Sequence, residues 1–195
     1  MLYISPGNIK VKCSIFNLPR IITCKPNLEC HKFCYASKAE RQYPNCLPCR
    51  LRNLEISKGN TFIQDVCTYL KNYKGKYFRI HESGDFYCTE YVYKWYEIIK
   101  TNPQIVFFAF TKRDDIFTEQ VLSEKPENLT LNFSIDGIDK AVDSQLLRKL
   151  GWNNVARISE TQTNCPVMTD KSLKCITNCT KCAMSNKEDI VFKKH

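Results

Sequence analysis

The 195-residue sequence lacks the long apolar segments of a membrane protein. No stretch approaches the ~20 consecutive apolar residues of a transmembrane helix. The first eight residues lack the charged and then apolar layout of a signal peptide, and there is neither a low-complexity linker nor a long internal repeat. We therefore expect a globular protein in the reducing cytoplasm, without a membrane partner.

Cysteine, by contrast, is abundant, with twelve in the chain. In a reducing compartment, and in a chain long enough to build a core without disulfides, grouped cysteines indicate metal ligands or catalytic thiols. Cys13, Cys67 and Cys88 stand alone in apolar surroundings, and we interpret them as small core residues. The other nine are grouped, and this grouping carries most of the functional information in the sequence.

The first group is Cys24-x5-Cys30-x3-Cys34, just after an expected early strand. Three thiolates can hold a [4Fe–4S] cluster with one iron left open to a ligand, which chemistry at the cluster requires. Cys46 and Cys49 follow at x2 spacing. Either could supply a fourth ligand, or the pair could be a separate dithiol or half of a zinc site.

The second group is Cys165-x9-Cys175-x3-Cys179-x2-Cys182, in a loop-rich tail. Four thiols at this spacing indicate a metal site with a structural or electron-relay role. Zinc also binds four thiolates, but zinc ribbons usually have two x2 pairs, so the spacing favours an iron–sulfur cluster and leaves zinc as the alternative metal.

The middle of the chain alternates between the periods of helices and strands, which predicts parallel strands joined by right-handed crossovers. We predict an α/β fold: an open parallel sheet of about five strands or a partial (β/α) barrel, with a cysteine-rich N-terminal loop and C-terminal tail. The domains are 1–160 and a metal-binding tail, 161–195. Strands are expected at 9–15, 76–81, 104–110, 129–135 and 154–158, and helices at 61–73, 89–100, 115–124 and 139–150, the last capped by Asp139.

Polar clusters follow the predicted strands, at the carboxyl edge where parallel sheets bind ligands. Ser134, Asp136 and Ser159 are among them, although turns and helix caps also explain such residues. The densest cluster spans residues 79–86, where four ionisable groups surround a glycine. We predict catalytic roles for His81, Glu82 and Asp85, and substrate-binding roles for Ser83, Gly84, Lys112 and Arg113.

Several of these segments resemble the phage "gene product 88" family over about residues 5–185. The similarity lies in Thr23 to Ala36, Tyr77 to Phe86 (YFRIHESGDF), the helix with Tyr91 and Trp95, Phe110 to Lys112, and the cysteine tail.

A more distant resemblance is to radical S-adenosylmethionine enzymes, which have a partial barrel and a three-cysteine loop after the first strand. This resemblance implies that Cys24, Cys30 and Cys34 hold the cluster. It also implies that Glu82, Ser83 and Gly84 contact the amino group of S-adenosylmethionine. The x5 and x3 spacing here differs from the x3 and x2 spacing of that superfamily.

The sequence thus predicts an iron–sulfur enzyme with two [4Fe–4S] clusters, performing redox or radical-type chemistry on a small molecule and receiving electrons from a donor. The alternative is a zinc-stabilised nucleic-acid-binding module that uses basic side chains and Phe33, Tyr35 and Tyr43 for stacking. The net charge of +9 is spread along the chain. It therefore suits a solvated lysine-rich surface as well as a nucleic-acid partner.

Overall fold

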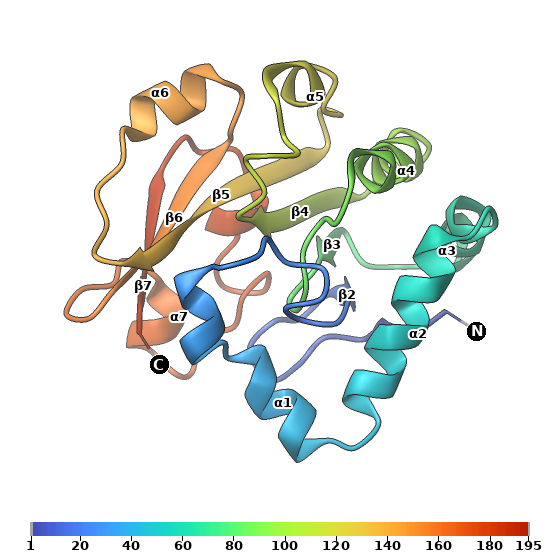
Figure 1. The fold of residues 1–195 in the computed structure, drawn as a ribbon, viewed down its shortest axis with the longest axis horizontal. Helices are drawn as coiled ribbons and strands as arrows, with labels where there is room; N and C mark the ends of the chain where they lie inside the picture. The colour runs from blue at the N-terminus through green and yellow to red at the C-terminus, as the bar shows by residue number, and fades with distance from the viewer. Residues whose placement is uncertain (1, 195) are drawn as a thin grey trace.

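One seven-stranded sheet runs through the protein, and its strands follow one another in chain order (Figure 1). The computed structural model describes residues 2–194. β1 is antiparallel to β2, and all later neighbours are parallel. The strands are β1 (Ile4–Ser5), β2 (Ser14–Phe16), β3 (Tyr77–Ile80), β4 (Val106–Thr111), β5 (Leu129–Ile138), β6 (Asn154–Ser159) and β7 (Asp189–Lys193).

The predicted α/β class with an open parallel sheet is confirmed, and the sheet does not close into a barrel. It has seven strands instead of about five because the sequence reading missed β1 and β7. β7 comes from the tail and pairs with β6, so residues 161–194 complete the same sheet. Across the described residues, no helix is both long and apolar enough to cross a bilayer.

The α-helices are α1 (Ala36–Gln42), α2 (Cys46–Lys58), α3 (Phe62–Lys71), α4 (Thr89–Lys100), α5 (Glu119–Ser123), α6 (Ser144–Lys149) and α7 (Pro166–Thr169); two short 3-10 helices are η1 (Glu29–Phe33) and η2 (Lys181–Ala183). Helices α2 to α6 lie on one side of the sheet and connect β2 through to β6 (Figure 1). The connection from β6 to β7 contains η2, which packs on the other side. The predicted helices at 61–73 and 89–100 correspond to α3 and α4.

Two predicted helices begin later than expected. α5 begins at Glu119 because the Thr118 hydroxyl caps it by accepting from the Val121 N–H. Asp139 does not cap α6; Asp143 does, accepting from the N–H groups of Gln145 and Leu146. Asp139 has a φ of 50° and sits in the β5–α6 loop instead. Both errors reflect the ability of several nearby Thr and Asp residues to act as caps.

The N-terminal region predicted as loop contains helices α1 and α2. The buried side of α2 is largely polar: Asn53 donates to Tyr3 O and Asn17 O, and Arg50 pairs with Glu40 at 2.8 Å. Its exposed side carries Leu47 and Leu51. Because three of the four buried residues of α2 are polar while Leu47 and Leu51 are exposed, the helix lacks the usual apolar periodicity.

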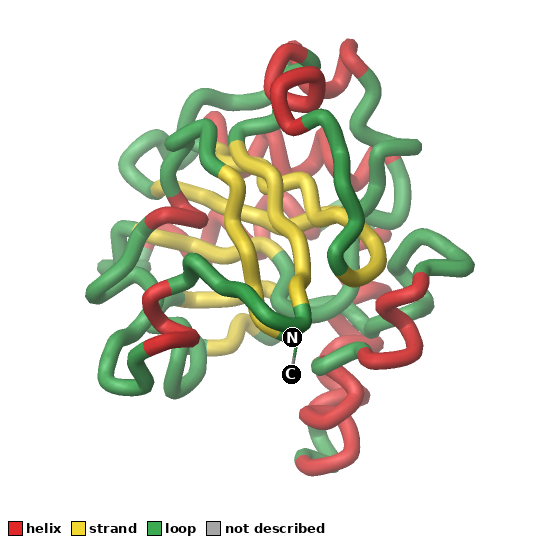
Figure 2. The backbone as a smooth tube through the Cα atoms, turned by 90° about the vertical axis from the view of Figure 1, so that its left-hand side faces the viewer, coloured by secondary structure: helices red, strands yellow, loops and turns green. Residues whose placement is uncertain are grey.

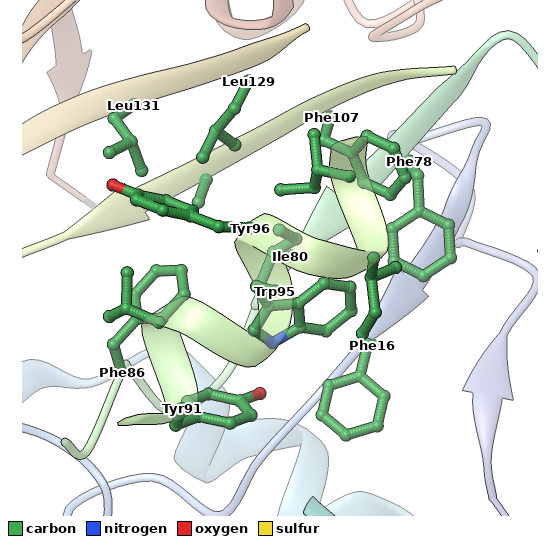
Figure 3. Close-up of a cluster of buried hydrophobic side chains, with 14 of the residues drawn as sticks. Phe16, Phe78, Ile80, Phe86, Tyr91, Trp95, Tyr96, Phe107, Leu129 and Leu131 are labelled. Atoms are coloured by element: carbon green, nitrogen blue, oxygen red, sulfur yellow. The ribbon is translucent and has the colours of Figure 1, made fainter. Parts of the chain in front are cut away.

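The two faces of the sheet are covered differently. Residues such as Phe78, Phe107 and Leu131 pack against α3 and α4, around the fully buried Trp95 (Figure 3). The opposite face carries a smaller apolar cluster of Val11, Cys13, Ile15, Phe108 and Ala183, contacted by Cys175 and Ile176. Loops therefore cover this second face where helices cover the first (Figure 2, loops green).

Candidate metal and substrate site

The loop carrying Cys24, Cys30 and Cys34 lies against the carboxyl ends of β4 and β5. Asp136 fixes it there, accepting hydrogen bonds from the N–H groups of Glu29 (2.6 Å) and Cys30 (3.1 Å). These bonds join segments more than a hundred residues apart in the chain. Asp136 is thus a positioning residue for the three-cysteine loop.

The thiols of this loop are partly buried. Burial, together with the nearby Asp85 and Cys34, raises the pKa of Cys24 to about 11. Burial also raises the pKa of Cys30, to about 12, against the lowering effect of Lys112. At neutral pH these groups are protonated thiols, and a metal would have to displace their protons.

Lys112, which the sequence assigns to substrate binding, extends into the same region. Its Nζ donates to the Ser134 carbonyl (3.3 Å) and hydroxyl (2.9 Å) and to the Ile135 carbonyl (2.9 Å). Burial lowers its pKa, while the neighbouring Cys30 and Asp136 raise it. Within the described chain, no carboxylate lies within salt-bridge distance of this ammonium.

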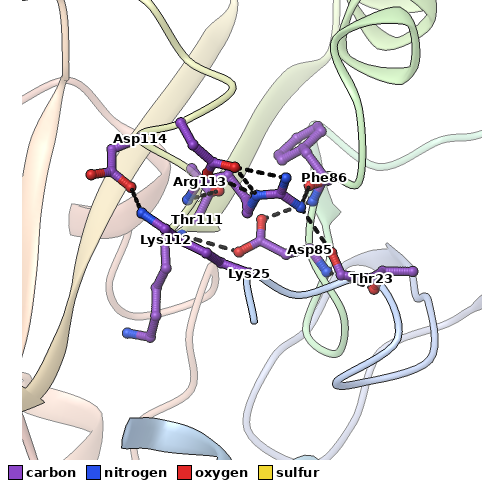
Figure 4. A network of polar contacts seen from close by, with 9 residues as sticks. Thr23, Lys25, Asp85, Phe86, Thr111, Lys112, Arg113 and Asp114 are labelled. Atoms are coloured by element: carbon purple, nitrogen blue, oxygen red, sulfur yellow. Dashed lines mark hydrogen bonds and ion pairs between the residues drawn. The ribbon is translucent and has the colours of Figure 1, made fainter. Parts of the chain in front are cut away.

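Asp85 and Arg113 brace the loops around this region (Figure 4). Asp85 is buried and accepts from the N–H groups of Lys112 (3.0 Å) and Phe86 (2.8 Å). Burial raises its pKa to about 6, opposed by its hydrogen bonds. Arg113 donates to the carbonyls of Thr23 and Phe86 and pairs with Asp115. Arg113 therefore ties three loops together, and its three side-chain nitrogens bond to Thr23, Phe86 and Asp115.

His81, assigned a catalytic role from the sequence, lies in the aromatic core. It has a φ of 61°, and its Nε2 is 2.9 Å from the Tyr91 hydroxyl. Its ring contacts Phe86 and Phe16, and burial lowers its pKa to about 3. The structure thus holds His81 as a neutral imidazole beneath α4.

Glu82, Ser83 and Gly84 form the turn after His81. Asn17 Oδ1 accepts from the N–H groups of both Glu82 and Ser83, and the Glu82 carboxylate accepts from Asn8. Gly84 has a φ of 77°, and a Cβ there would stand 2.6 Å from Thr23 Oγ1. The glycine allows this turn to pack directly against the segment that leads into Cys24.

The tail is held on the other face of the sheet by buried polar side chains that the sequence analysis missed. Asn132 donates to the carbonyls of Ala109 and Cys182, both at 2.9 Å. Asn154 donates to Asn132 and to the Met184 carbonyl. Thr130 donates to Ala183 O. The sequence did contain a signal for these contacts, because polar residues at inward positions of otherwise apolar strands need buried hydrogen-bond partners.

The four tail thiols span eighteen residues of chain, yet Cys182 lies near enough to Cys165, Cys175 and Cys179 for each of them to raise its pKa. Burial is the largest cause, and together these effects raise the pKa of Cys182 to about 12. Cys13, interpreted from the sequence as a core residue, is buried, and it lies close enough to Cys175 for that thiol to raise its pKa.

Arg79, on β3, is the cation of this second region. Burial raises the pKa values of Cys13, Cys175 and Cys182, and the positive charge of Arg79 opposes this rise. Its Nε donates to the His81 carbonyl, and the guanidinium lies over the Phe110 ring. The nearest carboxylate, Glu82, is 4.0 Å from Nη1.

Neither group of thiols is arranged as a preformed metal site. Throughout residues 2–194, no three His, Cys, Asp or Glu side chains are placed so that they could hold a metal ion. Cys46 and Cys49 lie in the first turn of α2, partly exposed. Cys67 and Cys88 pack against the main core, as expected.

Comparison with known proteins gives the chain's relatives. The model of a family described as "Gene product 88" matches residues 4–191. The Gene 88 proteins of Mycobacterium phages L5 and D29 are each 31% identical over 119 residues, which is 55% of this chain and 49% of theirs. The chain therefore spans about half the length of these relatives, and no solved structure matches it. Because the family model covers nearly the whole chain, this protein belongs to the gene product 88 family.

Proposed function

We propose that this protein is an iron–sulfur enzyme that carries two [4Fe–4S] clusters and performs redox chemistry on a small molecule at the carboxyl edge of its sheet. Cys24, Cys30 and Cys34 would hold the first cluster. The second would bind the tail cysteines, Cys165, Cys175, Cys179 and Cys182. One observation carries the proposal: each group of thiols adjoins a buried basic side chain that lacks a close carboxylate partner.

A buried cation without an anion is costly, since it loses its hydration without regaining a counter-charge. Lys112, beside the first group, has no carboxylate within salt-bridge distance in the described structure, and Arg79, beside the second, has only Glu82, at 4.0 Å. A cubane bound by three or four thiolates carries roughly −1 or −2 charge, which would compensate such a cation. Neutral thiols cannot do this.

The donor set also suits the clusters. All seven proposed ligands are thiols, the ligand type that iron–sulfur clusters use most. They lie in segments 17–35 and 160–188, where loops alternate with the short helices η1, α7 and η2. His31, between Cys30 and Cys34, has a buried Nε2 without a hydrogen-bond partner in the described structure, which is consistent with a missing neighbour in this loop.

When bound, the clusters would supply one-electron transfer. The protein's own groups would do the rest. Lys112 would present a positive charge to an anionic substrate at the three-thiol site, and Asp85, with a pKa of about 6, would hold or release a proton near neutral pH. His81 would act as a positioning residue that fixes the turn at 82–85 from inside the core.

S-adenosylmethionine is a candidate cosubstrate of the three-thiol site in this proposal. In the segment Glu82-Ser83-Gly84, the carboxylate is that of Glu82, and it already accepts a hydrogen bond from the Asn8 amide at 2.7 Å. Binding of the amino group would therefore displace Asn8. A shift in the electron paramagnetic resonance spectrum of the reduced protein on adding S-adenosylmethionine would support this part, and an unchanged spectrum would remove it.

The main test is purification without oxygen, followed by iron and sulfide analysis and a visible spectrum. We expect a brown protein with about eight irons per chain that bleaches with dithionite. Cys24→Ser/Cys30→Ser/Cys34→Ser and Cys175→Ser/Cys179→Ser/Cys182→Ser should each lose about half of the iron. Cys67→Ser/Cys88→Ser, which changes thiols outside both groups, should lose none.

A colourless protein with stoichiometric zinc would overturn the proposal and favour the zinc-stabilised alternative.

A second measurement addresses Lys112. Because a positive charge near a cluster favours its reduced form, Lys112→Met should make the reduction potential of one cluster more negative. Lys71→Met, which removes an exposed lysine at the end of α3, is the control and should leave both potentials unchanged.

A further inference from the structure

A basic hollow lies beside the tail, away from the substrate edge. Two cavities of about 750 and 430 Å³ lie next to each other, since Met168 and Lys193 line both. We call the two together the basic hollow. Its basic lining residues are Lys10, Arg157, Lys171, Lys174, Lys193 and Lys194.

The charge of this surface is one-sided. Of the residues lining the two cavities, all of them within the described chain, none is acidic, although the whole chain has 20 acidic residues against 29 basic ones. The nearby Asp170 accepts hydrogen bonds from the Ser172 N–H and hydroxyl, and its charge acts on Lys174. Lys194 pairs with Glu160 at 3.0 Å. Lys10, Arg157, Lys171 and Lys193 form no salt bridge within the described residues, so their positive charge is available to a ligand.

The floor is apolar, with Val167, Met168 and Leu173, and the larger cavity adds hydroxyl and amide groups from Thr163, Asn164 and neighbouring residues. Arg157 enters this cavity with a buried Nε that has no partner in the described structure. A site of this kind offers cations for phosphates, amides for polar edges and an apolar surface for flat rings.

We propose that the basic hollow binds a single-stranded nucleic acid. Several cations along one depression fit a ligand with repeating negative charge better than a small anion, which would meet one or two of them. A concave surface is a poor match for a flat bilayer. A duplex keeps its base faces stacked inside, whereas a single strand can place them against Met168 and its apolar neighbours.

The test is fluorescence anisotropy with a labelled oligonucleotide of about 20 thymidines, using the metal-loaded full chain. The variant Lys10→Glu/Lys171→Glu/Lys193→Glu alters three exposed side chains of the hollow that form no hydrogen bond or salt bridge within the described residues. The matched control is Lys71→Glu/Lys74→Glu/Lys100→Glu, at exposed positions on and near α3 and α4. Each variant lowers the formal net charge from +9 to +3, three substitutions of two units each.

We expect the hollow variant to bind at least about thirtyfold more weakly and to lose about 2 from the slope of log affinity against log salt, at 0.7 per phosphate contact. The control should retain most of its affinity, and both should keep their metal content. Equal losses in the two variants would overturn the proposal, because net charge alone would then explain binding. Equal or tighter binding to the matched duplex, or binding only to vesicles of anionic lipid, would overturn it as well.

Discussion

The two faces of the sheet use the same strands but are stabilised by different interactions. On the helix-covered face, β4 and β5 present Phe107 and Leu131 to an aromatic and aliphatic core. On the other face, the neighbouring residues Thr130 and Asn132 bind main-chain carbonyls of the tail. Apolar packing is strong and depends mainly on volume, whereas hydrogen bonds to carbonyls fix one particular position of a segment. The first face stabilises the fold, and the second positions the tail cysteines.

The largest effect is expected on the helix-covered face. Trp95 is fully buried and contacts Phe16, Phe62 and Phe78. Trp95→Ala removes this volume and leaves a cavity, so the free energy of unfolding should fall by about 3 to 5 kcal/mol in urea denaturation. Tyr43→Ala, which truncates an exposed aromatic ring, should change it by less than about 0.5 kcal/mol. A loss below about 1 kcal/mol for Trp95→Ala would contradict this account of the core.

A smaller and more local effect is expected on the tail-covered face. Asn132→Ala leaves the carbonyls of Ala109 and Cys182 without their donor, which should cost about 2 to 3 kcal/mol. Hydrogen exchange at residues 182–184 should speed up more than exchange in α4. Asn72→Ala, at an exposed position whose side chain makes no hydrogen bond in the described structure, is the control. Uniformly faster exchange in both regions would mean that Asn132 supports the whole sheet and does not specifically hold the tail.

The contrast between the faces also explains what could be predicted from the sequence. The strands β3 to β6 and the helices α3 and α4 follow apolar periodicity, because their side chains meet in one large core. Helix α2 gives no such signal, since Asn53 and Ser57 face inward while Leu51 is exposed. β7 was hidden in the cysteine tail, and its place beside β6 depends on a long-range pairing.

The candidate site was predictable in part for the same reason. The cysteine groups and the polar strand ends can be read from spacing and order along the chain. The carbonyl contacts of Asn132 and Asn154 cannot, because their partners lie 23 to 50 residues away in sequence. His81 was expected at the edge as a catalytic group, but its positive φ directs the ring under α4. A single backbone angle thus moved one residue from the edge into the core.

His81 offers a pH test of the helix-covered face. Its pKa is about 3 in the folded protein and 6.5 when exposed, so the unfolded chain binds the extra proton between these values. Stability should therefore be complete above pH 6.5 and fall as the pH drops towards 3. At pH 5 the His81 contribution amounts to a loss of about 2 kcal/mol.

Asp85 works in the opposite direction, and this makes the test sharper. Its pKa is about 6 when folded and 3.8 when exposed, so acidification from pH 7 to 5 stabilises the folded state by about 1 kcal/mol. His81→Asn, which suits a positive φ, should lower stability overall but remove the acid-dependent loss, leaving a protein slightly more stable at pH 5 than at pH 7. Asp85→Asn should steepen that loss. Urea midpoints at the two pH values distinguish these outcomes, and an unchanged pH slope in His81→Asn would mean that the imidazole is already protonated in the folded core.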